Sequence, residues 1–235
     1  MQELYPEYSR QQIQSWIMQG KVKVDGRVVT KAGTPVSIEL PVECDAQEPK
    51  YVSRAGFKLE KALDEFGIDV TGFTVLDAGL STGGFTDCLI KKGAKKIFGV
   101  DVGYGQVHEK IRSNEHVVVM ERTNLRSLEW AQEPVDLVTL DLSFISVLKV
   151  MVAVTGALKK DGHLIVLIKP QFEAERHEVG RGGIIKDQAV HQKVVEKITG
   201  GIKGYGYQLI GVTESPILGG SGNKEFLAYF KRANA

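Results

Sequence analysis

Four charged residues fall at the ends of predicted strands and helices, and in a parallel α/β sheet such ends meet at one crevice. The four are Lys58, Asp141, Lys169 and Glu225. Lys169 closes a run of five apolar residues at 164–168, and an ammonium group there needs a partner or a function. A strand-end lysine also reaches solvent along its aliphatic stem, so Lys169 alone fits both interpretations equally. Four such charges on converging ends favour chemistry.

Two lysines beside two acids suit the removal of a proton from a poor nucleophile such as a hydroxyl group. An unperturbed lysine amine has a pKa of about 10.4. Burial and a neighbouring cation such as Lys58 lower the pKa of a lysine towards neutral pH, which makes Lys169 the candidate general base. We expect Asp141 and Glu225 to orient the two lysines and to balance their charge. The set therefore predicts transfer of an activated group to an alcohol oxygen held in line with it.

A glycine-rich turn follows the first strand of the same region, in V-L-D-A-G-L-S-T-G-G-F at residues 75–85. Glycines let the backbone turn tightly and approach a ligand closely. The spacing differs from the G-x-G-x-x-G of dinucleotide sites, so NAD is not expected. Asp101, at the end of the second strand, is placed to bind ribose hydroxyls, and Asp77 to hold an amino group directly or through water. The alternative is that these are helix caps and turn residues. The predicted cofactor contacts are Asp77, Gly79, Ser81, Gly83, Gly84, Asp101, Thr123, Asn124 and Asp141.

Strands and helices alternate from residue 51 to residue 235, and the strands are continuous apolar runs. Helices are expected at 54–66, 84–91, 106–112, 146–157 and 187–203, and strands at 74–77, 96–101, 117–120, 137–141, 163–169, 207–214 and 225–231. Repeated strand–helix units predict a Rossmann-like α/β domain at 51–235, with a mostly parallel seven-stranded sheet covered on both faces. The last two strands have no helix between them and are expected as an antiparallel pair at the sheet edge.

Residues 1–40 predict a small α+β module, and residues 41–50, which have no periodicity, predict a linker. Ser9 can cap a helix that runs to about Met18, Asp25-Gly26 predicts a hairpin, and a further strand is expected at 36–40. The basic residues of the module suit binding to an RNA backbone, although a solvated basic face fits them equally. The predicted RNA contacts, three of them in the larger domain, are Arg10, Lys21, Lys23, Arg27, Lys31, Arg54, Arg176 and Arg181.

The composition narrows the class of protein. The chain of 235 residues is 43% hydrophobic and 25% charged, as in ordinary globular proteins, and its net charge of +1 does not by itself indicate a nucleic-acid partner. The two cysteines support neither a disulfide framework nor a Cys-rich zinc site. The apolar stretches are shorter than the roughly 20 residues of a membrane helix, and no signal peptide is visible. We therefore expect a cytoplasmic protein with no membrane or metal partner.

Three parts of the sequence resemble known families. Residues 9–29, S-R-Q-Q-I-Q-S-W-I-M-Q-G-K-V-K-V-D-G-R-V-V, resemble the S4-type RNA-binding domain, without the earlier helix that is usual there. The glycine turn and Asp101 are similar to the class I S-adenosylmethionine methyltransferases, in which Thr123-Asn124 falls at the adenine contact. The order Lys58, Asp141, Lys169, Glu225 resembles the K-D-K-E tetrad of the FtsJ-type ribose 2′-O-methyltransferases.

The context of the tetrad extends the resemblance to nearly the whole chain. The segments S-R-A-G-F-K-L, D-L-S-F-I-S, I-K-P-Q-F-E and G-N-K-E-F resemble the TlyA family, also called the hemolysin A family. The resemblance implies S-adenosyl-L-methionine as the cofactor and ribosomal RNA or ribosomal subunits as the partner. It also implies 2′-O-methylation of cytidines as the activity.

The same residues disfavour other activities. D-L-S-F at 141–144 stands where amino-group methylases have D-P-P-Y, but both prolines are absent and such enzymes do not need Lys169. A cysteine-nucleophile cytosine methylase is disfavoured because neither Cys44 nor Cys88 follows the fourth or fifth strand. A pore-forming hemolysin lacks an amphipathic or apolar membrane segment in the sequence. An inactive RNA-binding relative is disfavoured by the intact tetrad. Residues 171–186 are expected as an irregular loop that orders when substrate binds, although a mobile surface loop without a role in binding fits them equally.

Overall fold

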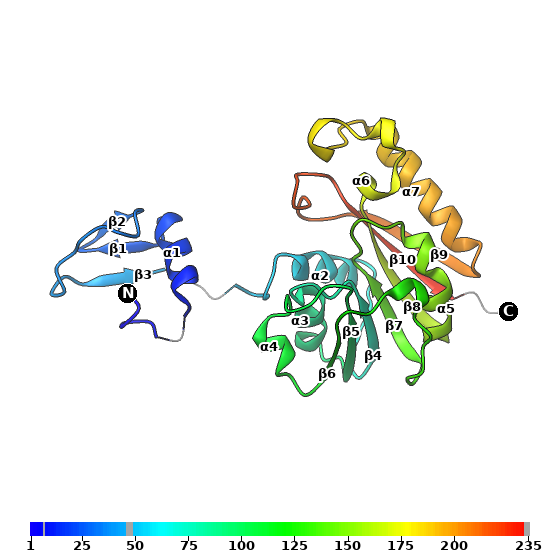
Figure 1. The fold of residues 1–235 in the computed structure, drawn as a ribbon, viewed down its shortest axis with the longest axis horizontal. Helices are drawn as coiled ribbons and strands as arrows, with labels where there is room; N and C mark the ends of the chain where they lie inside the picture. Colours follow the sequence, from blue (N-terminus) through cyan, green and yellow to red (C-terminus); the bar gives the residue numbers. More distant parts are fainter. Residues whose placement is uncertain (7, 46–48, 233–235) are drawn as a thin grey trace. The chain divides into compact units, whose positions relative to one another are not determined.

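The computed structural model describes residues 1–6, 8–45 and 49–232. The chain divides into two compact units, Met1–Lys50 and Tyr51–Ala235 (Figure 1), and each unit has its own hydrophobic core. Of the predicted linker at 41–50, residues 46–48 lie outside the described residues.

The smaller unit packs one helix on three short antiparallel strands. Helix α1 (Arg10–Met18) begins with a capping box, in which Ser9 and Gln12 each accept a hydrogen bond from the other's backbone N–H. Its residues Ile13, Trp16 and Ile17 recur at helical spacing and are buried against the sheet. The strands are ordered β2-β1-β3, with bounds Val22–Val24 for β1, Arg27–Val29 for β2 and Val42–Cys44 for β3.

The third strand of this unit does not lie where the sequence predicted it. The strand expected at 36–40 is wrong, because none of these residues lies in a strand and Ile38 is 92% exposed. Instead β3 forms inside the predicted linker, where Val42 pairs with Val24 and Cys44 with Val22. Val42 and Cys44 pack against the core beneath α1, so burial of two apolar residues decides which segment joins the sheet.

The larger unit is built on a seven-stranded sheet in the order β6-β5-β4-β7-β8-β10-β9. Every neighbouring pair is parallel except those made by β10, which is antiparallel to both β8 and β9. The predicted mostly parallel seven-stranded sheet is therefore confirmed. The bounds are Thr74–Ala78 for β4, Lys96–Val100 for β5, Val117–Met120 for β6, Val135–Leu140 for β7, Leu158–Ile168 for β8, Tyr207–Glu214 for β9 and Phe226–Arg232 for β10.

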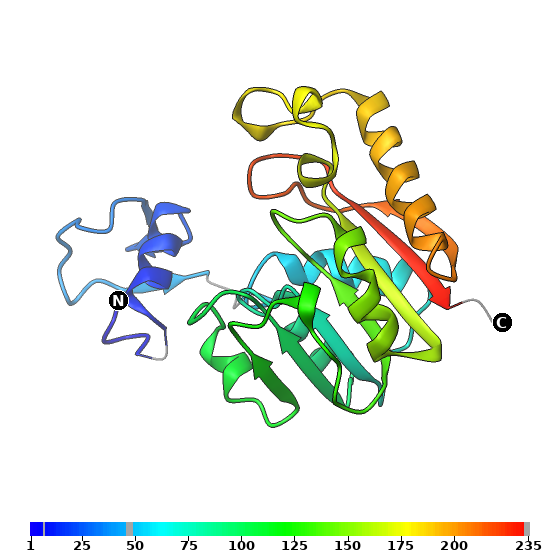
Figure 2. The ribbon, with the colours of Figure 1, turned by 45° about the vertical axis from the view of Figure 1, so that its right-hand side comes forward.

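Helices cover both faces of this sheet, because successive strand residues point to opposite sides. In β4, Val75 joins a core under α2 (Ala55–Glu65) and α3 (Gly84–Lys91), while Leu76 joins a core under α5 (Met151–Ala157) and α7 (Gln188–Lys203). Figures 1 and 2 show α7 lying along β9 and β10. The short elements are α4 (Glu109–Arg112), α6 (Pro170–Glu173) and the 3-10 turns η1 (Leu125–Ser127), η2 (Val147–Val150), η3 (Arg176–Glu178) and η4 (Arg181–Gly183).

The strand order places a crevice beside β4. The chain leaves β4 to form β5 on one side and later returns to form β7 on the other, and ligands of such sheets bind outside the strand ends at this switch. Two helices differ from expectation near that edge. Helix α4 is shorter than 106–112 because the His108 side chain accepts from Lys110 N–H and caps it, and the helix expected from 146 opens as the 3-10 turn η2.

Candidate active site

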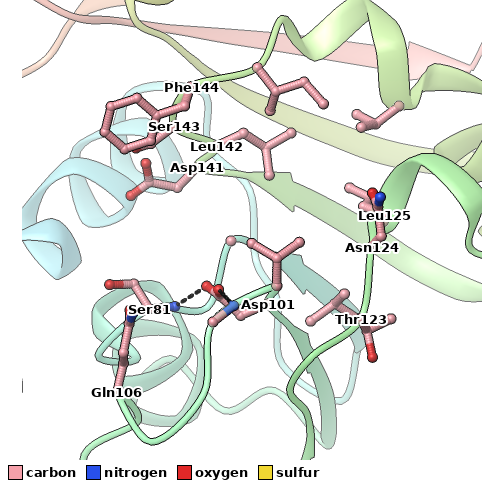
Figure 3. Close-up of a pocket in the computed structure, with 16 residues that line it drawn as sticks. Ser81, Asp101, Gln106, Thr123, Asn124, Leu125, Asp141, Leu142, Ser143 and Phe144 are labelled. Atoms are coloured by element: carbon pink, nitrogen blue, oxygen red, sulfur yellow. Dashed lines mark hydrogen bonds between the residues drawn. The ribbon is translucent and has the colours of Figure 1, made fainter.

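A cavity of 370 Å³ lies outside the carboxyl ends of β4, β5 and β7, where the topology predicts a ligand. A second cavity of 60 Å³ shares Gly79, Ser81 and Asp141 with it. Figure 3 shows Asp141 and Phe144 along one wall, with Ser81 and Asp101 across from them and Asn124 at the side. The predicted cofactor residues that line the larger cavity are Gly79, Ser81, Asp101, Thr123, Asn124 and Asp141, and Gly84 lines the smaller one.

The glycine turn contributes Gly79 and Ser81 to the walls of both cavities. Gly79 and Gly83 have φ of 91° and 98°, a left-handed region that favours glycine. A Cβ on Gly79 would clash with the Asp141 carbonyl oxygen, and one on Gly84 with the Ser53 hydroxyl. The glycines therefore bring the start of α3 close to the end of β7 and to the loop before α2.

The variant Gly79→Ala tests this packing. We expect its free energy of unfolding to fall by about 2 kcal/mol, because alanine is strained at this φ and its Cβ has no room beside the Asp141 backbone. We also expect at least a tenfold loss of cofactor affinity, since the wall of both cavities must move. Urea unfolding and calorimetry measure the two effects. Gly156→Ala is the control, because a Cβ there meets nothing within 4 Å, and wild-type-like binding by Gly79→Ala would refute the assignment.

Asp101 stands on the cavity wall and orders the loops around it. Its Oδ2 accepts from Ser81 N–H at 2.7 Å and its Oδ1 from Gly103 N–H at 2.7 Å, while its carbonyl accepts from Thr123 N–H at 2.9 Å. Each carboxylate oxygen has a further lone pair for a hydroxyl donor. Asn124 caps η1 through a hydrogen bond from Arg126 N–H. Both residues thus combine the turn role and the cavity position that the sequence left as alternatives.

Asp77 does not lie on the wall of either cavity. Its carboxylate is fully buried and accepts hydrogen bonds from Thr86 at 2.6 Å and Thr139 at 2.8 Å. Burial raises the pKa of Asp77 to about 6, against the two threonine hydrogen bonds, which lower it. The prediction that Asp77 holds an amino group directly is therefore not supported, because the strand end turns this side chain under α3. Gly83 likewise packs on Ile111 and lines neither cavity.

The buried Asp77 predicts a pH dependence of stability. Its folded pKa of about 6 lies above the unfolded value of about 3.9, so the folded protein binds this proton more tightly. The free energy of unfolding should therefore fall as pH rises from about 4 to about 6, by at most about 1.4 kcal/mol per pH unit. Asp77→Asn should lack this contribution to the slope. Urea unfolding of both proteins between pH 4 and 8 measures it, and identical slopes would contradict the assignment.

Lys169 and Asp141 form one of two lysine–acid pairs. Lys169 Nζ lies 2.6 Å from Asp141 Oδ1 and donates to Ser143 Oγ at 3.0 Å. Both side chains are largely buried, at 11% and 14% exposure. Lys169 directly follows β8, and Asp141 directly follows the neighbouring parallel strand β7. Asp141 lines both cavities, so it connects the lysine to the predicted cofactor site.

Lys58 and Glu225 form the second pair, in which Lys58 Nζ donates to Glu225 Oε2 at 2.5 Å. Lys58 is 8% and Glu225 2% exposed. Phe226 pairs with Ile168 in the antiparallel β10–β8 ladder, so Glu225 and Lys169 stand at adjacent strand ends. The structure thus brings the four residues to the end of the sheet where β7 and β8 terminate and β10 begins. Each lysine is paired with one of the two acids.

The predicted RNA contacts are spread over both units. Arg10, Lys23, Arg27 and Lys31 are exposed and Lys21 is half-buried, and Arg54, Arg176 and Arg181 are exposed in the larger unit. Lys23 stands across from Val28 and Glu43, whereas Arg27 stands across from Val24. Because directly opposed residues share a face, the hairpin presents its two cations on opposite faces of the small sheet.

The segment 171–186 is more regular than the sequence predicted. It contains most of α6 and the turns η3 and η4, joined by residues in no helix or strand. Its ordering on binding of substrate stays a prediction. Asn223, which is 1% exposed, donates to the Gly183 carbonyl at 2.8 Å and accepts from Ile185 N–H at 2.9 Å. The end of the segment is therefore attached to the turn that precedes Glu225.

Several wall residues were not among the predicted contacts. All but Ser53 lie in the loops that follow β4, β5 and β7, so the strand-end rule that selected Asp101 and Asp141 would have indicated these loops. Ser53 lies just before α2, where that rule does not apply. Phe144 is notable because it is 90% exposed with φ of 64°, and its ring lies 4.9 Å from the Phe172 ring. These residues are Ser53, Thr82, Val102, Gly103, Gln106, Leu142, Ser143, Phe144 and Ile145.

Comparison with known families matches both units. The model of the FtsJ-like methyltransferase family matches residues 51–232, and that of the S4 domain matches residues 1–41. Within the described residues, no helix has the length and apolar character to cross a membrane. The same residues hold no group of three or more His, Cys, Asp or Glu side chains arranged for a metal ion.

Individual relatives match over almost the whole chain. The 16S/23S rRNA (cytidine-2'-O)-methyltransferase TlyA of Mycobacterium tuberculosis is 42% identical over 227 residues, which cover 95% of this chain and 84% of the relative. Hemolysin A of Brachyspira hyodysenteriae is 42% identical over 225 residues, covering 94% and 93%. A solved structure described as "Putative hemolysin from Streptococcus thermophilus" has a TM-score of 0.79 at 36% identity and covers 97% of this chain and 84% of that chain.

Proposed function

The chain belongs to the FtsJ-like methyltransferase family, and from this premise we propose that it transfers a methyl group from S-adenosylmethionine to a ribose 2′-hydroxyl of ribosomal RNA. The observation that carries the proposal is the pairing of Lys169 with Asp141 at the edge of a nucleoside-sized cavity. The relative from Mycobacterium tuberculosis is named for cytidine-2'-O methylation of 16S and 23S rRNA, which supports cytidine as the target. We place this activity in the cytoplasm, where ribosomal RNA is available.

The residues that line the cavity support S-adenosylmethionine as its ligand. Asp101 could accept hydrogen bonds from ribose hydroxyls. The apolar side chains of Val102, Leu125 and Leu142 line the walls and would pack against the adenine base. Gly79 has a left-handed φ and no Cβ, so the Asp141 backbone packs directly against this turn, and both residues line the cavity. Bound there, S-adenosylmethionine would supply a methyl group already activated by its sulfonium.

The residues of the chain would supply the acceptor side of the reaction. A ribose hydroxyl is a poor nucleophile until it loses its proton, and we assign the removal of this proton to the Lys169 amine. Asp141 and Ser143 hold this amine from two directions, and their loop lines the cavity. Lys58 and Glu225, buried at the adjacent strand end, fix the other side of the acceptor site.

Methylation of purified ribosomal subunits with labelled S-adenosylmethionine tests the proposal. A methylated 2′-hydroxyl can no longer attack its own phosphodiester, so the labelled nucleotide should survive alkaline hydrolysis as an alkali-resistant dinucleotide. Label recovered in an alkali-sensitive mononucleotide would show base methylation and overturn the ribose assignment. Absence of label from free rRNA and from both subunits, with S-adenosylmethionine bound in calorimetry, would support an inactive RNA-binding protein instead.

Charge reversal in the smaller unit tests its role as an RNA-binding module. We expect Lys23→Glu to weaken rRNA binding and to reduce the salt dependence of binding by about one phosphate contact. Cofactor affinity should stay at the wild-type value, because Lys23 belongs to the unit without the cavity. Filter binding at several salt concentrations measures the effect. Lys160→Glu, on an exposed residue of β8, is the control, and equal losses in both variants would show only non-specific electrostatics.

A further inference from the structure

Glu173 is a buried acid that the four-residue site does not use. It is 3% exposed and ends α6, four residues after Lys169. Its Oε1 accepts from Val147 N–H at 2.8 Å, and its own carbonyl accepts from Lys197 Nζ at 2.6 Å. Burying a carboxylate is costly unless hydrogen bonds compensate for it. The hydrogen bond from Val147 N–H therefore offsets part of the cost of burying the Glu173 carboxylate.

That backbone group closes the loop that forms one cavity wall. Val147 begins η2, and residues 141–145 immediately before it all line the larger cavity. The loop starts at Asp141, whose N–H donates to the Ala78 carbonyl at 3.0 Å. It is held in the middle at Ser143 by Lys169 and at its end by Glu173. Two of these three attachments come from the five residues 169–173.

The loop needs such attachments because its backbone is strained. Phe144 adopts a left-handed φ of 64° although it is not glycine, and its side chain is 90% exposed. A conformation of this kind persists only where surrounding contacts fix it. The ring contact with Phe172 is again made by the segment that carries Lys169 and Glu173.

We propose that Glu173 is a positioning residue that holds the 141–146 loop so that Asp141 and Ser143 aim the Lys169 amine at the acceptor hydroxyl. This inference rests on the proposed function, and it assigns Glu173 an effect on the rate of transfer rather than on cofactor binding. The simpler alternative is that Glu173 only stabilises the start of a helix. That alternative predicts loss of stability with unchanged turnover in the folded protein.

The experiment compares Glu173→Ala, Glu173→Gln and Ile97→Ala in the full-length protein. Glutamine keeps an amide oxygen that can accept from Val147 N–H, so we expect kcat within about threefold of wild type. Alanine should lower kcat on the order of 100-fold, the cost of a small misplacement of reacting groups, with the KM for S-adenosylmethionine within about threefold. Ile97 is fully buried near the start of β5, so Ile97→Ala destabilises the fold without touching the loop.

Backbone hydrogen exchange supplies a readout that does not need activity. We expect peptides covering residues 141–148 to exchange faster in Glu173→Ala than in Glu173→Gln or Ile97→Ala. A kcat for Glu173→Ala equal to that of Ile97→Ala, or failure of Glu173→Gln to restore kcat, would overturn the inference. Faster exchange of the loop in Ile97→Ala as well would also overturn it. A wild-type protein that methylates no rRNA would instead refute the proposed function. The exchange rates of residues 141–148 would then decide by themselves whether Glu173 holds the loop.

Discussion

Replacement of Lys169 by alanine is expected to abolish methyl transfer while S-adenosylmethionine still binds within about threefold of the wild-type affinity. A positioned general base contributes roughly 10²- to 10⁴-fold to a rate. The rate of methyl transfer by the variant should therefore fall close to or below the detection limit. The cofactor should still bind because Lys169 lines neither cavity. Single-turnover methylation and calorimetry measure the two quantities on the same preparations.

Two further variants isolate the amine in this experiment. Lys169→Met keeps an unbranched side chain beside Asp141 and Phe172 but removes the base, so it should be as inactive as Lys169→Ala. Lys160→Ala removes an exposed lysine from the far end of the same strand and should be fully active. Substantial transfer by Lys169→Met would sink the general-base assignment and leave orientation as the role of this residue.

Removal of Glu225 is expected to damage both stability and activity. Lys58 is 8% exposed and pairs with Glu225 at 2.5 Å, so Glu225→Ala leaves a buried ammonium group without its carboxylate. Breaking a buried pair in this way costs about 3–5 kcal/mol. We expect the free energy of unfolding to fall by that amount and transfer to be lost. The control is Glu65→Ala, which removes one partner of the exposed Lys61–Glu65 pair on α2, the helix that carries Lys58. This variant should change stability little.

A double variant separates the two consequences. Replacing both members of a buried ion pair by apolar residues of similar size often restores stability, so Lys58→Met combined with Glu225→Leu should unfold near the wild-type denaturant concentration. It should remain inactive, because the charges of the acceptor site are gone. Recovered activity in this stable double variant would show that the pair serves only the fold.

The strand-end rule explains which parts of the site the sequence could predict. Asp101, Asp141, Lys169 and Glu225 were selected because each borders a strand, and topology alone brings such positions together. The strand-end rule does not give which lysine of the tetrad pairs with which acid. Lys58 and Glu225 are 167 positions apart, and only the insertion of β10 beside β8 makes them neighbours.

Two differences between the expected and the observed positions have physical causes. Asp77 borders a strand like the others, but its side chain turns under α3 to Thr86 and Thr139, and a sequence pattern does not give the direction of one carboxylate. Val36, Ile38 and Leu40 alternate with polar residues as in a strand. The strand that pairs with β1 is nevertheless formed by the segment with Val42 and Cys44, because these two side chains pack against the core under α1. Competition between two short apolar segments is decided by packing, which is not visible in either segment alone.

The position of β10 also bears on when during biosynthesis the enzyme can first work. A ribosome makes this strand after every other described element, and domains fold as the chain emerges. Yet β10 fills the gap between β8 and β9 and brings Glu225 to Lys58. A nascent or prematurely terminated chain that lacks residues 225–232 therefore has a split sheet and a buried lysine without its counter-ion. Premature termination would thus yield an inert chain rather than an unregulated methylase.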